Sequence, residues 1–212
     1  LDTIAPTKLE NTMIFVIGDN GTEQPLLCQC PQLPAGGKAT LFETGIRIPL
    51  IVKGPLVANP GRHSDELIGA VDLWRTIADI TGASVNVVMP LTPVDSKSFL
   101  PLIQNPLAAG LRDFTFSQVF NTNGPWPNYP PLQYPVCQTR NERSISDGRY
   151  KLVRIQDNGT SQPCPPNAVF IDFLVDLMSD PLETTNLLPN LTSEQSDAYD
   201  ALKAALDDIS NP

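Results

Sequence analysis

The stretch TMIFVIGDNG, residues 12–21, joins a short apolar run to an acid, an amide and a glycine. The apolar part is continuous and rich in β-branched residues, which predicts a strand covered on both faces in a parallel sheet. Open α/β sheets gather their ligands at the carboxyl ends of such strands, where Asp19 and Asn20 would lie. Their oxygens suit a hard divalent cation, although the same residues taken alone form an ordinary turn.

The next segments predict an α/β fold. The stretch IRIPLIVKG, residues 46–54, predicts a second strand, and Pro49 favours an edge position or a bulge. Residues 64–82 predict a helix that Ser64 can cap and Gly82 ends. Its apolar positions have helical spacing and are Leu67, Val71, Trp74 and Ala78. The order strand, loop, strand, helix is typical of α/β proteins.

Antiparallel strands and one helix are predicted for the C-terminal part. Residues 112–120 and 168–177 predict strands, and Asp147-Gly148 predicts the turn of a hairpin between two more. Residues 193–209 predict a helix with a capping box formed by Thr192 and Gln195. Its apolar stripe is Tyr199, Leu202, Leu206 and Ile209. We therefore expect an α/β domain over 1–111, with a linker from about 84, and a smaller sheet-plus-helix subdomain over 112–212.

Charge and hydropathy restrict the partners. The 212 residues include 14 basic and 23 acidic side chains, which give a formal charge of −9 without a basic cluster. We therefore expect no nucleic-acid partner. The sequence has no apolar stretch near the roughly 18 residues that cross a bilayer, so no membrane partner is expected. Because the sequence begins with Leu1, we expect a processed or partial polypeptide.

The four cysteines leave two interpretations open. Cys28 and Cys30 lack a second pair at the spacing of a zinc site. Cys137 and Cys164 could form a disulfide, which would favour a periplasmic or secreted protein, or they could be buried free thiols. The compartment therefore stays open.

Several motifs resemble the sulfatase family of the alkaline phosphatase superfamily. After Asp-Asn-Gly at 19–21 come Gly-Gly-Lys at 36–38 and Glu-Thr-Gly-Ile-Arg-Ile-Pro at 43–49, where the family commonly has Glu-Gly-Gly-Ile-Arg-Val-Pro. Thr44 thus replaces a glycine. Four later stretches resemble the family's C-terminal landmarks in the same order: VDLWRTIADITGA (71–83), SFLPLI (98–103), DGRYKLVRI (147–155) and VDLMSDPLETTNLLPN (175–190).

The resemblance implies a fold and a chemistry. The fold would be part of an alkaline-phosphatase-like α/β/α sandwich, followed by a C-terminal subdomain with a small antiparallel sheet and a helix. The activity would be hydrolysis of a sulfuric ester, either an aryl or a carbohydrate sulfate. Asp19 and Asn20 would be ligands of a Ca²⁺ or Mg²⁺ ion, and Lys38 would be a catalytic residue that contacts the sulfate.

The nucleophile of the family is missing from this sequence. Sulfatases make formylglycine from a Cys/Ser-x-Pro-x-Arg motif, and the 212 residues contain none. The resemblance therefore implies a C-terminal portion that is incomplete and inactive alone, with an upstream N-terminal half as its partner. A phosphoesterase or phosphonate hydrolase of the same superfamily and a non-catalytic remnant or binding module are the alternatives.

Three other features receive structural interpretations. Arg47 is predicted to form an ion pair with Glu43 in preference to contacting sulfate. His63, the one histidine, is predicted to be a solvated loop residue. The aromatic-rich segment 121–142 is predicted to be a loop that packs its own side chains, with substrate contact as the alternative.

Overall fold

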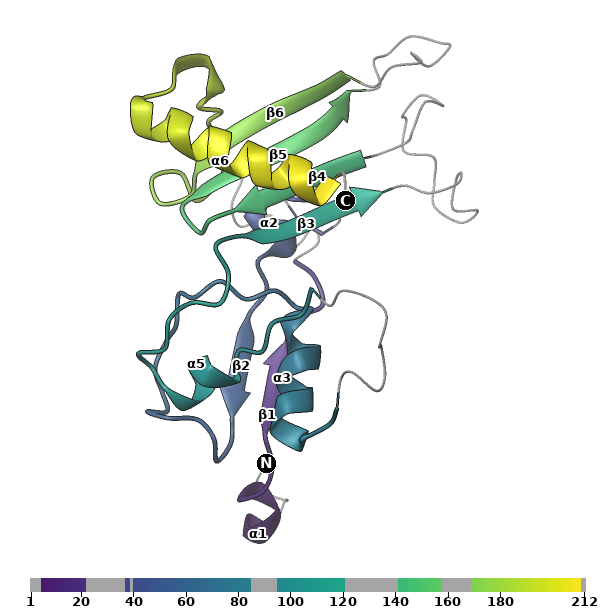
Figure 1. Cartoon of the computed structure of the whole chain (residues 1–212), viewed down its shortest axis with the longest axis vertical. Coiled ribbons are helices and arrows are strands. Elements are labelled where there is room, and N and C mark those ends of the chain that lie inside the picture. Colours follow the sequence, from purple (N-terminus) through teal and green to yellow (C-terminus); the bar gives the residue numbers. More distant parts are fainter. Residues whose placement is uncertain are drawn as a thin grey trace. The chain divides into compact units, whose positions relative to one another are not determined.

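The computed structural model divides the chain into two compact units (Figure 1). It describes residues 5–21, 37–38, 40–84, 95–120, 141–157 and 169–210. The N-terminal unit is Leu1–Asp19 with Ile48–Thr115, and the C-terminal unit is Asn20–Arg47 with Phe116–Pro212. The domain boundary at residue 111 stays a prediction. The described residues between Asn20 and Arg47 group with the C-terminal half.

The N-terminal unit is built on a two-stranded antiparallel sheet. Its elements are α1 (Pro6–Leu9), β1 (Ile14–Ile17), β2 (Leu50–Lys53), α3 (Asp72–Thr81) and α5 (Leu100–Gln104). The core residues Phe99, Leu102 and Ile103 pack against one face of the sheet, including Phe15 and Val52. These two are cross-strand partners, so their side chains share that face.

The opposite face of this sheet is apolar and open to solvent. Val16 pairs with Ile51, and the two side chains are 56% and 61% exposed. The strand predicted at 12–18 is therefore present as β1, but its partner in the described part of the chain is antiparallel. Pro49 precedes β2, where its carbonyl accepts a hydrogen bond from Gly18 N–H at 3.2 Å.

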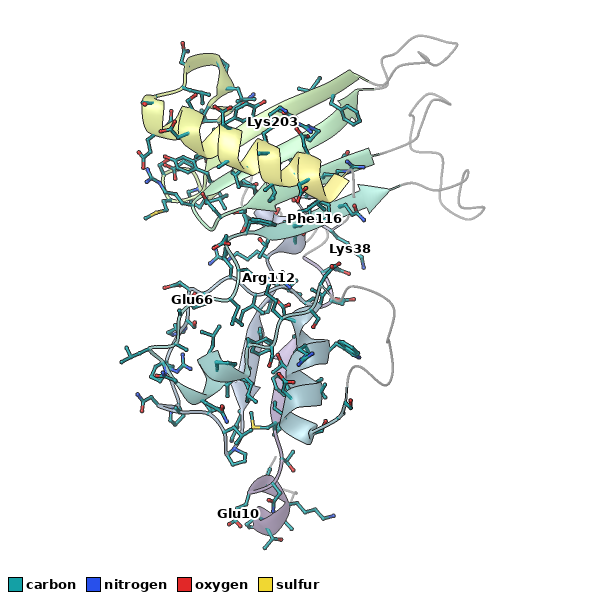
Figure 2. The ribbon with its side chains drawn as sticks, in the orientation of Figure 1. Glu10, Lys38, Glu66, Arg112, Phe116 and Lys203 are labelled. Carbon is teal, nitrogen blue, oxygen red and sulfur yellow. The ribbon has the colours of Figure 1, made fainter. Side chains whose placement is uncertain are left out.

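Helix α3 begins eight residues later than predicted, at Asp72 instead of Ser64. Asp72 is 2% exposed. Its carboxylate accepts the N–H groups of Gly69 at 2.8 Å and Lys97 at 2.7 Å, and it also binds the guanidinium of Arg112, a residue labelled in Figure 2. The contacts from Lys97 and Arg112 come from distant segments, so local sequence signals could not indicate that the helix starts at Asp72. Its end at Gly82 is as predicted, with φ at 70°.

The C-terminal unit contains a four-stranded sheet in the order β3-β4-β5-β6. The strands are β3 (Thr115–Phe120), β4 (Asn141–Ser146), β5 (Tyr150–Asp157) and β6 (Val169–Asp176), and they confirm the predicted strands. Asp147-Gly148 forms the predicted hairpin turn. The Asp147 carboxylate accepts the N–H groups of Arg149 and Tyr150 at 2.8 and 2.6 Å, and Gly148 has a φ of 96°.

Helix α6 (Ser193–Ser210) lies across one face of this sheet (Figure 1). Its predicted capping box is present, because Thr192 N–H donates to Gln195 Oε1 at 2.9 Å and Gln195 N–H donates to Thr192 Oγ1 at 3.3 Å. Leu202 and Leu206 of the predicted stripe are buried. The C-terminal unit also contains α2 (Glu43–Ile46) and the 3₁₀ turn η2 (Leu188–Asn190).

An ionic cluster fixes α6 to the sheet. Arg154 on β5 donates to both carboxylate oxygens of Asp172 at 2.7 and 2.9 Å and to Asp207 of α6 at 2.6 Å. Tyr199 of α6 donates to Asp172 at 3.0 Å. Asp207 therefore contributes to the packing of α6 on the sheet.

The helices that the structure describes include none with the length and apolar character needed to cross a bilayer. The four cysteines and the central part of segment 121–142, including its aromatic residues, lie outside the described residues.

The network around Asp72 predicts a pH-dependent stability. Burial opposes ionisation, but the hydrogen bonds from Arg112, Lys97 and Gly69 outweigh it, so the pKa of Asp72 lies below its ordinary value of 3.8. The stabilisation from ionised Asp72 is therefore present above that value and is lost as pH falls through the lowered pKa. Asp72→Asn should reduce the free energy of unfolding at pH 7 by about 3 kcal/mol.

Urea unfolding of the two proteins between pH 7 and pH 2 measures this difference, which should narrow below about pH 4 as Asp72 becomes protonated. Asp79→Asn is the matched control on the same helix, because Asp79 forms a largely exposed pair with Arg75. It should change the free energy by less than about 1 kcal/mol. Equal losses in the two variants at pH 7 would contradict the role given to Asp72.

Candidate functional site

The residues predicted to bind a cation follow β1 directly. Asp19 is exposed, and Asn20 is partly buried, with its Nδ2 donating to the Gly21 carbonyl at 2.7 Å. Gly21 N–H donates to the Gly45 carbonyl at 2.8 Å. A Cβ atom added to Gly21 would lie 1.9 Å from the carbonyl oxygen of Thr44. Only glycine therefore permits this close approach of the chain to α2.

The predicted sulfate-binding residue lies beside the same short helix. Lys38 has an exposed side chain (Figure 2) and follows the buried Gly37, whose φ is 133°. The Gly37 carbonyl accepts the N–H and the Oγ1–H of Thr40 at 3.1 and 2.7 Å. A Cβ atom added to Gly45 would lie 2.3 Å from the Gly37 carbonyl oxygen. The turn at Gly45 thus brings the Asn20-Gly21 backbone and the Gly37-Lys38 backbone together.

A buried ionic triad holds α2 against the sheet. Lys151 of β5 is 1% exposed, and its ammonium lies 3.0 Å from Glu43 Oε1 and 2.7 Å from Glu183 Oε1. The other oxygen of Glu183 accepts the backbone N–H of Glu43 at 2.5 Å. We call Glu43, Lys151 and Glu183 the triad. Burial raises the pKa of the Glu183 carboxyl above its ordinary value, although Lys151 opposes this shift.

The triad corrects the interpretation of Arg47. Glu43 pairs with Lys151 and not with Arg47, whose side chain is exposed. Arg47 N–H instead closes the turn of α2 by donating to the Glu43 carbonyl at 2.8 Å. His63 is exposed in a loop, as predicted.

Thr44, which replaces a glycine of the family pattern, has an unusual hydroxyl. Its Oγ1 is buried and makes no hydrogen bond within the part of the chain that the structure describes. An unpaired buried hydroxyl costs about 1–3 kcal/mol. This substitution therefore adds polarity to α2 beside Gly45 without adding stability.

The side-chain oxygens of Asp19 and Asn20 are the kind of ligand that a hard cation binds, but two residues are too few to complete its coordination. Asp19 and Asn20 offer carboxylate and amide oxygens, which Ca²⁺ and Mg²⁺ prefer. The described residues contain no group of three or more His, Cys, Asp or Glu side chains suited to a metal ion. Ca²⁺ takes about 6–8 oxygen ligands, so an ion at these two residues needs further donors from elsewhere.

The triad is the part of the site region that the sequence did not predict. Its members are far apart in the sequence, because Lys151 lies 108 positions after Glu43 and Glu183 lies 140 positions after it. One signal was available, because Lys151 stands between Tyr150 and Leu152 in the segment 150–153, which has no other charged residue. A charge in such a position requires a buried partner of opposite charge.

Comparisons with known proteins identify the family. Residues 37–211 match the family model described as N-sulphoglucosamine sulphohydrolase, C-terminal. The N-acetylglucosamine-6-sulfatase of Bos taurus is 38% identical over 97 residues, which cover 46% of this chain and 16% of that protein.

Solved structures show the same fold. A structure in complex with its substrate D-glucosamine-2-N,6-O-disulfate has a TM-score of 0.68 and 19% identity and covers 95% of this chain and 34% of that chain. The phosphonate monoester hydrolase of Silicibacter pomeroyi has a TM-score of 0.61 and 20% identity, with 96% and 36% covered. At these identities the likeness shows the fold alone.

The chain belongs to the sulfatase family and corresponds to a C-terminal portion of its members. The predicted membership is confirmed, as is an α/β fold of the alkaline-phosphatase-like type. The matched stretches span 16% of the Bos taurus protein and about a third of the two solved chains.

The packing at Gly45 predicts that adding a single methyl group there lowers the free energy of unfolding. Gly45→Ala places a Cβ atom 2.3 Å from the Gly37 carbonyl oxygen and 2.5 Å from that of Thr40, so the backbone segments must separate. We expect a loss of about 1–3 kcal/mol in the free energy of unfolding, measured by urea titration. Gly69→Ala is the control, because its added Cβ would make ordinary contacts at 3.5 and 3.6 Å. Coincident unfolding curves for the two variants would contradict the packing described here.

Proposed function

We propose that the protein containing this chain hydrolyses sulfate esters of amino sugars, and that Asp19, Asn20 and Lys38 belong to its active site. The observation that carries this proposal is the packing of Asn20-Gly21 and Gly37-Lys38 against one turn of α2 in a member of the sulfatase family. That packing places Asn20, whose side-chain oxygen can bind a cation, and Lys38, which carries an ammonium group, on adjoining backbone segments.

Lys38 is the residue proposed to contact the sulfate. Hydrolysis of a sulfate ester leaves negative charge on the oxygen that departs with the sugar. A fixed ammonium near that oxygen stabilises the developing charge more in the transition state than in the ground state. The exposed side chain of Lys38 is available for such a contact.

Asp19 and Asn20 are proposed to hold a Ca²⁺ or Mg²⁺ ion. The ion would supply Lewis-acid polarisation of the sulfuryl group when bound. Asp19 would contribute the charged ligand and Asn20 a neutral oxygen. The backbone directly after Asn20 is held by the hydrogen bond from Gly21 N–H to the Gly45 carbonyl at 2.8 Å.

The proposed substrate class follows from the names of the relatives. The family model is that of an N-sulphoglucosamine sulphohydrolase, and a relative is an N-acetylglucosamine-6-sulfatase. A structure of the same fold was solved with D-glucosamine-2-N,6-O-disulfate as its substrate. These names are the basis for proposing a sulfated glucosamine unit, and an aryl sulfate is the alternative, since arylsulfatase A of Homo sapiens is 26% identical over 207 residues.

The open face of the β1–β2 sheet is proposed to bind the upstream N-terminal half of the same sulfatase domain. Val16 and Ile51 are cross-strand partners that expose apolar surface on this face. The chain covers about a third of the solved proteins of the same fold, so the rest of such a domain is available as the occupant. That half would also supply the formylglycine nucleophile and further ligands of the cation.

Lys38→Ala tests the catalytic role in the full-length protein. We expect turnover of glucosamine 6-sulfate, measured as sulfate release, to fall by about 10²–10³-fold, because a donor to the developing charge is lost. The midpoint of urea unfolding should change little, since Lys38 is exposed. Lys8→Ala, another exposed lysine, is the control and should retain full turnover.

Equal turnover of Lys38→Ala and Lys8→Ala would contradict this role. A phosphonate monoester should be included as a second substrate. If the unaltered protein hydrolyses it faster than the sulfate ester, the phosphonate hydrolase alternative replaces the sulfatase.

Asp19→Ala tests the cation. Isothermal titration of the full-length protein with CaCl₂ and with MgCl₂ should show a dissociation constant at least about tenfold higher in the variant, because a charged ligand is lost. Asp65→Ala is the matched control, since Asp65 is an exposed aspartate of a loop. An unchanged dissociation constant in Asp19→Ala would exclude Asp19 as a ligand.

A further inference from the structure

Lys151 lies at the centre of a contact pathway that leads from the four-stranded sheet to Asn20 and Lys38. We infer that Lys151, held between Glu43 and Glu183, positions the backbone that carries these two residues. The inference rests on the proposed function, because positioning matters only if Asn20 and Lys38 act together. Lys151 itself is a positioning residue and is not proposed to touch substrate.

The first step of the pathway is the strand. Lys151 pairs with Ser146 of β4 on one side and with Val175 of β6 on the other. The central strand β5 is hydrogen-bonded to a neighbouring strand on each side, which fixes its backbone. Its ammonium group therefore starts from a well-defined position, and its side chain is 1% exposed.

The second step fixes the start of α2. Glu43 contacts both other members of the triad, because its side chain lies 3.0 Å from the Lys151 ammonium and its backbone N–H donates to Glu183 at 2.5 Å. Glu183 also lies 2.7 Å from the same ammonium. A four-residue helix cannot maintain its own position through internal hydrogen bonds, so these tertiary contacts must do so.

The third step leads from α2 to the candidate site residues. Gly45 lies two residues after Glu43 and accepts the Gly21 N–H at 2.8 Å. Its Cα is in close contact with the Gly37 carbonyl, as the 2.3 Å clash of an added Cβ demonstrates. Displacement of α2 would therefore displace both Asn20-Gly21 and Gly37-Lys38.

The triad contributes more to the position of α2 than to the stability of the fold. A lysine buried with two carboxylates loses its hydration, and apolar side chains of similar volume often pack in such places at no loss of stability. An apolar residue at position 151 could not bind the carboxylates of Glu43 on α2 and Glu183 in the segment after β6. The triad therefore specifies where α2 lies.

The test is Lys151→Met in the full-length protein, with hydrogen exchange of backbone amides and sulfate release as the two readouts. We expect exchange at the Gly21 and Arg47 amides to accelerate at least tenfold. We also expect kcat to fall at least tenfold, with the CaCl₂ concentration for half-maximal activity raised. Glu43→Gln, which keeps the shape of the side chain, should shift both readouts in the same direction and is the substitute if Lys151→Met does not fold.

Arg154→Met is the matched control. Arg154 is on the same strand but on the opposite face, where it forms an ionic cluster of similar kind with Asp172 and Asp207. It should lower the unfolding midpoint without altering exchange at Gly21 and Arg47. If Lys151→Met changes these amides no more than Arg154→Met does, the inference is wrong.

The inference and the proposed function fail in different ways. Faster exchange at Gly21 and Arg47 with unchanged kcat would overturn the inference, because the positioning would have no effect on the reaction. An unaltered protein that releases no sulfate would overturn the proposed function. The exchange measurement would then still decide whether Lys151 fixes this backbone.

Discussion

The meeting of three backbone segments at Gly45 is the constraint on which the candidate site depends. The chain around Gly21, the chain around Gly37 and the turn of α2 approach so closely that a Cβ atom fits on neither Gly45 nor Gly21. Backbone groups at this separation exclude side chains and water and leave few alternative arrangements. Asn20 and Lys38 adjoin these glycines, so their backbone positions are fixed as well. The side chain of Lys38 is nevertheless exposed to solvent.

Buried charges hold each unit in a similar way. In the N-terminal unit the Asp72 carboxylate accepts hydrogen bonds from two backbone N–H groups and from the guanidinium of Arg112. In the C-terminal unit Lys151 forms ion pairs with two carboxylates. Arg154 connects β6 to α6 through ion pairs with Asp172 and Asp207. Each cluster connects segments that are distant in the sequence, and each charge has partners, as burial requires. Positions of helices α2, α3 and α6 are therefore set by ionic contacts as well as by apolar packing.

Local signals in the sequence were sufficient for much of the fold. The Asp147-Gly148 turn, the Thr192 capping box and the end of α3 at Gly82 depend on neighbouring residues alone. The start of α3 was predicted wrongly because Asp72 is fixed by Lys97 and Arg112, which lie 25 and 40 residues away. The partners of Lys151 and the meeting at Gly45 were missed for the same reason, since the lone charge at Lys151 indicates that a partner exists but no local pattern shows which residues supply it. Asp19, Asn20 and Lys38 could be proposed because they stand within recognisable family motifs.

The sulfatase chemistry proposed for this chain requires a nucleophile that its own 212 residues do not encode. The most direct test is denaturing intact-mass spectrometry with peptide mapping of the full-length protein purified from its source organism. We expect one continuous polypeptide with an upstream Cys/Ser-x-Pro-x-Arg peptide whose first residue is formylglycine. A full-length protein without that motif, or with an unmodified serine or threonine nucleophile in its place, would contradict the assignment as a sulfatase.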